Sequence, residues 1–218
     1  MMNQLVWEGN LARTVQLADR LYLRLGNLEV RDQCNVGIVE GENSLALIDY
    51  PEQSPDHEII DEAESHLNKP VKTILFTHAH GDHRNGLATL RRQDITLVGS
   101  NSCIQEIKAQ FPGLPQKTVE ITKNGSRDFD GIVFEFFFPH QLPAHSPWDM
   151  QIALPEHDMM FVGDFLVPLN YMYFHSSNIR NWTASLFRMQ KTKMYSELVM
   201  GHGTICSKHF CAKAMEYQ

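Results

Sequence analysis

The sequence contains no apolar run long enough to cross a membrane, which requires about 20 consecutive apolar residues. Its first residues, Met1–Glu8, lack the basic segment followed by an apolar segment that marks a secretory signal. The four cysteines form no Cys-x-x-Cys pair, so nothing indicates an extracellular disulfide framework. We therefore expect a protein with no membrane association, located in the cytoplasm and holding its thiols reduced.

Positive charge is also scarce. The chain carries 19 Lys and Arg residues against 26 Asp and Glu residues, a formal net charge of -7 at pH 7. Because nucleic acid is bound by excess positive charge, we expect a small-molecule substrate and no nucleic-acid partner. Two aromatic stretches, 134–138 and 171–174, are typical of core and pocket wall, and they would also suit the contact face of a homodimer.

Length and composition are those of a globular enzyme. The 218 residues, 43% of them hydrophobic and 21% charged, can bury a large core. We predict one domain over 1–218, built from two similar halves at roughly 1–115 and 116–218. Strands and helices alternate in both halves, which predicts an α/β (α+β) fold of two mixed sheets packed face to face with helices outside.

Hydrophobic periodicity gives the elements on which this prediction depends. Apolar runs predict strands at 18–25, 34–40, 44–49, 71–76, 94–99, 117–122, 131–138, 150–155, 159–164 and 197–200. Helical spacing predicts helices at about 55–68, 84–90, 101–111 and 178–193. Ser100 or Asn101 caps the third of these helices, and Gly26-Asn27 and Asn124-Gly125 predict turns.

A short polar stretch, 77–83, reads Thr-His-Ala-His-Gly-Asp-His and lies between a buried strand and an early helix, where α/β proteins place reactive side chains. In an extended loop, residues two positions apart point the same way, so His78 and His80 can hold one metal ion together. Asp82 and His83 lie where the helix begins and turn toward a second ion. Imidazole and carboxylate ligands suit zinc, with iron and manganese as alternatives.

The His-x-His-x-Asp-His pattern after a hydrophobic strand resembles the signature of the metallo-β-lactamase fold superfamily. The resemblance implies a four-layer αββα sandwich with two metal ions at one edge of the two sheets, and three more ligands downstream. His145, in His-Ser-Pro, resembles the third ligand of the first metal, with His140 as a rival. Asp164, in Phe-Val-Gly-Asp-Phe, resembles the carboxylate that bridges the two metals. His202, in Gly-His-Gly, resembles the last ligand of the second metal.

The resemblance thus assigns seven ligands in order: His78, His80, Asp82, His83, His145, Asp164 and His202. Asp49, at the end of the strand 44–49, resembles an aspartate that supports the metal loop from behind, although an aspartate there could also simply end a turn. Trp148 and Asp149 replace residues that are small in the family, so the indole either shapes the pocket or narrows it. His175 is a candidate for substrate contact or a surface histidine.

Such a site implies a hydrolase. Two zinc ions bridge a water and lower its pKa, so that a metal-bound hydroxide attacks an ester, lactone or thioester while Asp82 orients it or moves its proton. Asp164 argues against the true zinc β-lactamases, which usually have Cys or Ser there. Val167 stands where quorum-lactone hydrolases often carry Tyr, and the short stretch after His202 lacks the helical extension of glyoxalase II.

Two alternatives stay open. A persulfide dioxygenase-like oxidoreductase uses a similar motif to hold a single iron ion, and metal identity distinguishes it from the hydrolase. A non-catalytic relative would result if Trp148 closed the site.

Overall fold

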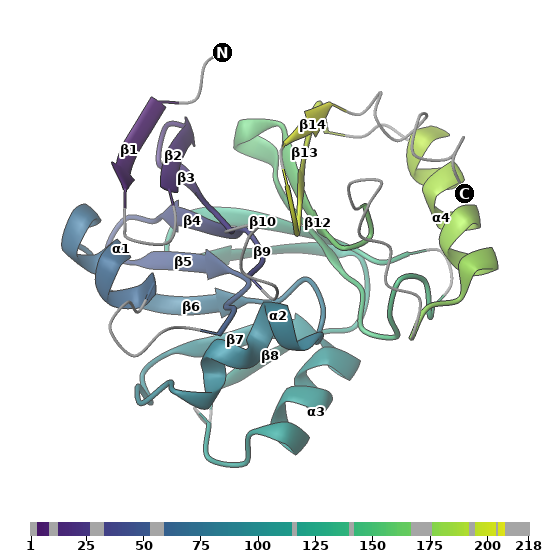
Figure 1. Ribbon diagram of the computed structural model, residues 1–218, viewed down its shortest axis with the longest axis horizontal. Helices are drawn as coiled ribbons and strands as arrows, with labels where there is room; N and C mark the ends of the chain where they lie inside the picture. Colours follow the sequence, from purple (N-terminus) through teal and green to yellow (C-terminus); the bar gives the residue numbers. More distant parts are fainter. Residues whose placement is uncertain are drawn as a thin grey trace.

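The computed structural model describes residues 4–8, 13–26, 33–52, 59–114, 117–139, 142–166, 176–191, 195–203 and 205–207. These residues form two β-sheets with helices on both outer faces, the four-layer αββα sandwich predicted from the sequence (Figure 1). Among the helices of these ranges, none is long and apolar enough to cross a membrane.

The first sheet has eight strands that lie side by side in chain order. They are β1 (Gln4–Glu8), β2 (Arg13–Ala18), β3 (Leu21–Leu25), β4 (Val36–Glu40), β5 (Leu45–Ile48), β6 (Val71–Leu75), β7 (Thr96–Ser100) and β8 (Thr118–Ile121). Pairing is antiparallel from β1 to β5 and parallel from β5 to β8. Parallel strands require crossover connections, and α1 (Ile59–Leu67) and α3 (Asn101–Gln110) provide two of them.

The second sheet has six strands, in the order β14-β13-β12-β11-β10-β9. They are β9 (Gly125–Phe129), β10 (Ile132–Phe137), β11 (Gln151–Leu154), β12 (Met159–Gly163), β13 (Glu197–Met200) and β14 (Cys206–Ser207). The 3-10 turn η2 (Pro155–His157) joins β11 to β12 in an antiparallel hairpin, at the two strands predicted over 150–155 and 159–164. α4 (Ile179–Lys191) lies between β12 and β13 in the chain, and these two strands are parallel.

Three clusters of buried side chains hold the four layers together. Neighbouring residues of a strand point to opposite faces, so Ile74 of β6 packs with Ile59 of α1, whereas Leu75 joins the cluster between the sheets. That central cluster also contains Phe161 of the second sheet. A third cluster places Trp182 of α4 against the outer face of the second sheet. Figure 1 shows α1 at the left, α3 at the bottom and α4 at the right of the molecule.

Several elements of the first half differ from prediction. β1 and β2 were not predicted, and the expected strand 18–25 corresponds to β3, because β2 ends at Ala18 and Arg20, with φ 57°, turns the chain into β3. Non-glycine residues rarely adopt positive φ, so the sequence carries no turn signal there. The expected helix 84–90 is divided into α2 (Gly81–Arg84) and η1 (Asn85–Ala88), because the Gly86 N–H donates to the Tyr50 carbonyl instead of continuing the helix.

The start of the second sheet also differs. The turn predicted at Asn124-Gly125 is displaced, since Gly125 already begins β9, and the chain reverses at Asp130-Gly131, where both φ angles are positive. β9 was not predicted because its residues are polar and mostly exposed, without the alternation that marks a half-buried strand. β8, predicted to open the second half, is the last strand of the first sheet.

The Asp130 carboxylate ties the two sheets together. Its oxygens accept hydrogen bonds from the backbone N–H groups of Asn43 and Ser44, each at 2.7 Å, and from the side chains of the same residues at 3.0 and 2.8 Å. Asn43 and Ser44 precede β5, and Asp130 precedes β10. Although partial burial alone raises the pKa of Asp130, these hydrogen bonds hold it at about 2.

We predict that Asp130→Asn lowers the free energy of unfolding by about 1.5–3 kcal/mol at neutral pH, because the amide loses the charge that these donors stabilise. Asparagine tolerates the positive φ of this position, so the effect reports on the carboxylate. A depressed pKa stabilises the fold above the ordinary carboxyl pKa of about 3.9, and this stabilisation is lost as the pH falls toward about 2. Urea unfolding at several pH values measures both effects.

Asp128→Asn is the matched control, because Asp128 is exposed and its carboxylate accepts one hydrogen bond, from the Gly131 N–H at 2.9 Å. This variant should change the free energy of unfolding by less than Asp130→Asn. A difference between the wild type and Asp130→Asn that stays constant as the pH falls would contradict the proposed role of the carboxylate.

Candidate metal centre

The predicted metal loop follows the end of β6 in the first sheet. β6 ends at Leu75, His78 and His80 lie in the extended segment that follows, and Asp82 and His83 lie on the short helix α2. His78 and His83 are buried, and His80 and Asp82 are partly exposed. Four side chains of the kinds that bind metal ions therefore lie within six residues of the chain.

The three remaining predicted ligands come from the second half of the chain. His145 lies in the segment 142–149, Asp164 follows the end of β12, and His202 follows the end of β13. β12 and β13 are parallel neighbours, and the Gly201 N–H donates to the Gly163 carbonyl at 2.9 Å, so Asp164 and His202 emerge at the same edge of their sheet. The rival candidate His140 lies outside the described residues.

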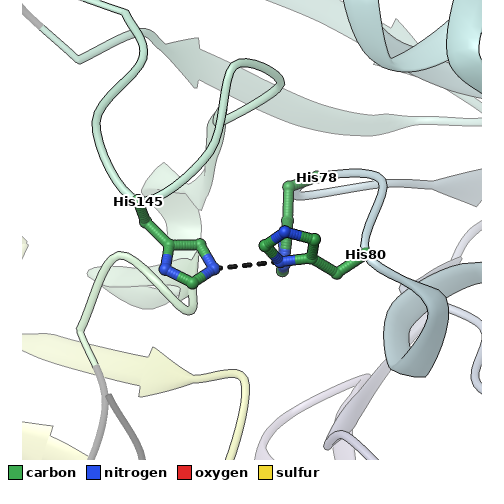
Figure 2. A group of neighbouring side chains, drawn as sticks. All are labelled: His78, His80 and His145. Carbon is green, nitrogen blue, oxygen red and sulfur yellow. Dashed lines mark hydrogen bonds between the residues drawn. The ribbon is translucent and has the colours of Figure 1, made fainter. Parts of the chain in front are cut away.

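His78, His80 and His145 form the first group, in which one nitrogen of each ring lies within 4.8 Å of the others. Figure 2 shows His78 and His80 projecting from one segment toward His145 on another, with His145 Nε2 and His80 Nδ1 3.1 Å apart. Burial, reinforced by the neighbouring imidazoles, lowers the pKa of His78 well below its ordinary value. Burial also lowers the pKa of His145, to about 4, and that of His80. The three rings are therefore neutral near pH 7, the form that binds a metal ion.

Asp82, His83, Asp164 and His202 form the second group, whose ligand atoms also lie within 4.8 Å of one another. His202 Nε2 is 2.9 Å from Asp82 Oδ2, and His83 Nε2 is 3.2 Å from Asp164 Oδ1. Burial alone would raise the pKa values of Asp82 and Asp164, but the imidazole of His83 and other neighbouring histidines hold both below the ordinary value. The second group thus differs from the first in holding two negative charges.

Asp164 lies between the two groups. Its Oδ1 atom faces His83 and its Oδ2 atom lies 3.8 Å from His145 Nε2 in the first group. The carboxylate is buried, with only 7% of the residue exposed. This is the placement that a carboxylate shared by two ions requires.

The atoms of the two groups are suited to binding metal ions. His78 Nε2 is buried without a hydrogen-bond partner in the described part of the chain. His83 Nε2 and Asp164 Oδ1 are buried and face each other at 3.2 Å without forming a hydrogen bond. Buried polar atoms without partners are costly, and a metal ion supplies the missing interaction. Four ligands at about 2.1 Å from a tetrahedral zinc ion lie about 3.4 Å apart. His202 Nε2 and Asp82 Oδ2 are 2.9 Å apart, and His145 Nε2 and Asp164 Oδ2 are 3.8 Å apart. All ligand atoms of a group lie within 4.8 Å of one another, so the separations are compatible with that value.

Asp49 holds the metal loop from behind. Its carboxylate accepts hydrogen bonds from the Thr77 N–H at 2.8 Å, from the Thr77 hydroxyl at 2.7 Å and from His83 Nδ1 at 2.9 Å. The bond to Nδ1 leaves His83 Nε2 facing the second group, because a ligating histidine is oriented by the partner of its other nitrogen. Asp49 therefore lies behind the candidate ligands and is hydrogen-bonded to the loop that carries them.

Asn35 is a supporting residue that the sequence did not reveal. Its Nδ2 atom donates to the carbonyls of Met200 and Gly203, each at 2.9 Å, and its N–H donates to the Gly201 carbonyl at 2.7 Å. These bonds surround the backbone on both sides of His202. Asn35 is 165 residues from Met200 in the chain, so only the folded structure brings them together. The one sequence signal was a polar asparagine at the start of the strand predicted over 34–40.

Cys34 lies beside Asn35, directly behind the second group. Its Sγ atom, an Asp49 carboxylate oxygen and a ring nitrogen of His83 lie within 4.8 Å of one another. Burial raises the pKa of the Cys34 thiol to about 12, so the thiol stays protonated at neutral pH. Cys34 therefore adds no charge to the site.

Two glycines let the second sheet approach the ligands. A Cβ atom at Gly201 would lie 2.2 Å from Asp164 Oδ1 and 2.7 Å from the His83 ring. A Cβ atom at Gly163, where φ is 55°, would lie 2.6 Å from the Thr77 hydroxyl. Any larger residue at either position would separate the ligands of the two sheets.

Of the two residues predicted to line the pocket, Trp148 and His175, the structure describes Trp148. Trp148 is partly exposed, and its ring stands edge-on to His80 with centroids 5.5 Å apart. His175 lies outside the described residues, so its role stays a prediction. The next residue, Ser176, was not predicted, and its hydroxyl is 2.8 Å from His80 Nε2. A single serine gives no sequence signal of such a contact.

Comparisons with known sequences identify a family and similar proteins. A model of the Metallo-beta-lactamase superfamily matches residues 30–202. The uncharacterized protein YobT of Bacillus subtilis (strain 168) is 29% identical over 144 residues, 60% of this chain. A hydroxyacylglutathione hydrolase of Rhizobium meliloti (strain 1021) is 29% identical over 170 residues, 77% of this chain. The chain spans 60% of the length of each of these two relatives.

Solved structures show the same fold. A metallo-beta-lactamase from Pontibacter korlensis has a TM-score of 0.80 at 19% identity, over 94% of this chain and 98% of that chain. The metallo-beta-lactamase FIM-1 from Pseudomonas aeruginosa, in its mono-zinc form, has a TM-score of 0.77 at 19% identity, over 94% of both chains. The matched residues, 30–202, include all seven predicted ligands. The chain belongs to the metallo-beta-lactamase superfamily.

Proposed function

We propose that this chain is a metal-dependent hydrolase with a dinuclear zinc site that acts on a small-molecule ester, lactone or thioester. The observation that carries the proposal is the convergence of seven ligand-type side chains into two groups, with Asp164 facing both. Membership of the superfamily and the cluster of potential metal ligands do not depend on which metal binds.

Divalent ions bound at the two groups would supply Lewis acidity and lower the pKa of a water molecule. The protein's own contribution is the arrangement of charge around them. The neutral rings of His78, His80 and His145 can hold one ion without adding charge, whereas Asp82 and Asp164 offset the charge of a second. Asp82 is partly exposed, so its carboxylate can also orient an attacking water and accept its proton.

The substrate class follows from the reaction that such a site favours. Preorganised positive charge stabilises the oxyanion that develops when water attacks an activated carbonyl carbon. Esters, lactones and thioesters all pass through such a state. The relative from Rhizobium meliloti is named a hydroxyacylglutathione hydrolase, which supports a hydrolytic activity on an acyl compound.

We predict that the purified protein binds two zinc ions per chain and that chelation abolishes hydrolysis and lowers the thermal midpoint. The reason is that metal removal leaves buried imidazole and carboxylate atoms without partners. Elemental analysis measures the stoichiometry, and calorimetry with and without chelator measures the stability. A single iron ion per chain would contradict the proposal and favour the oxidoreductase alternative, which an oxygen-consumption assay would then test.

We predict that Asp164→Ala loses one of the two zinc ions and reduces hydrolysis by about 100-fold or more, because both groups lose a shared ligand. Its circular dichroism should match that of the wild type, since the core strands do not depend on this carboxylate. Asp61→Ala, at an exposed position of α1, is the control and should keep both ions and full activity. Hydrolysis by Asp164→Ala at the wild-type rate would rule out the two-metal mechanism.

A further inference from the structure

Two indole rings flank the first group of ligands. Trp182 lies 5.1 Å from the His145 ring, measured between centroids, and Trp148 lies 5.5 Å from the His80 ring. Trp182 is sealed in the cluster under α4, with 1% of the residue exposed. Trp148 is partly exposed and packs at the margin of the cluster beneath α3. Trp148 is therefore the indole that a molecule arriving from solvent can touch.

The backbone on both sides of the Trp148 indole is fixed by hydrogen bonds. The Ser100 hydroxyl donates to the Trp148 carbonyl at 2.9 Å, and the Ser102 hydroxyl donates to the Pro147 carbonyl at 3.0 Å. The Trp148 N–H donates to the Ser146 hydroxyl at 3.2 Å. The start of α3 thus anchors the turn that carries the indole.

The turn is also closed on itself by a buried carboxylate. Asp149 accepts hydrogen bonds from the Ser146 N–H at 2.8 Å and from the Ser146 hydroxyl at 2.5 Å. All of these bonds use main-chain atoms or side chains other than the indole. Removing the indole therefore leaves the turn and its attachment to α3 intact.

We propose that Trp148 determines specificity by forming a rigid apolar wall beside His80, and that it selects substrates whose acyl part carries a flat apolar group. An arylacetyl group would be preferred over an acetyl group. A partly exposed indole gains apolar burial and ring stacking when such a group lies against it. Because the turn is already fixed, little conformational freedom is lost on binding. This inference rests on the proposed hydrolase function, since it assigns a substrate preference to the same site.

The test measures binding of two carboxylates that correspond to acyl products, phenylacetate and acetate, to the zinc-loaded protein by isothermal titration calorimetry. The wild type should bind phenylacetate about tenfold more tightly than acetate, because the phenyl ring contacts the indole while the carboxylate is at the metal centre. Trp148→Ala should lose this preference, and Trp148→Phe should keep most of it. Acetate affinity and zinc stoichiometry should be equal in all three proteins.

Phe187→Ala is the matched control, because it removes an aromatic side chain that is 49% exposed on α4. This variant should keep the wild-type preference. Equal binding of both carboxylates by the wild type would overturn the proposal, as would loss of zinc from Trp148→Ala, which would mean that the indole acts by holding His80. If the protein prefers phenylacetate but hydrolyses no ester, lactone or thioester, the role proposed for Trp148 would stand. Only the proposed hydrolase function would then be refuted.

Discussion

The carboxylate of Asp49 is the interaction on which the candidate site depends. The residue lies just after β5 and has a φ of 66°. Its carboxylate accepts three hydrogen bonds from the loop that follows the neighbouring parallel strand β6. Two of these bonds fix Thr77, which precedes His78, and the third orients the ring of His83. One buried aspartate thus sets the direction of a residue in each ligand group. Its position follows from the parallel pairing of β5 and β6, which brings both strand ends to one edge of the sheet.

A second constraint is that the sheets must approach closely where the ligands meet. Gly163 and Gly201 provide the space, and Asn35 fixes the backbone around His202. The Asp130 carboxylate holds the two sheets together by a separate set of hydrogen bonds. The separations between ligand atoms therefore depend on the sandwich as a whole, and no single loop determines them.

The sequence predicted the layers, most strands and the residues that assemble the two groups. Apolar runs are a strong local signal for the buried strands, and the dense run of imidazoles in residues 77–83 is one for the metal loop. His145, Asp164 and His202 have no such local signal and were predicted only from the resemblance to the metallo-β-lactamase superfamily. β9 and Arg20 escaped prediction, because an exposed edge strand and a positive φ at a non-glycine residue leave no pattern. Asn35 and Ser176 escaped for a different reason. Their partners are 165 and 96 residues away, and one sequence does not show which distant groups meet.

The separation of the ligands along the chain has a consequence for biosynthesis. Asp82 and His202 are 120 residues apart, yet their side chains are 2.9 Å apart in the folded protein. The second ligand group is therefore completed only after residue 202 has left the ribosome and both sheets have formed. An ion would bind at this group after the core has collapsed and would join the two sheets through residues that are far apart in the chain.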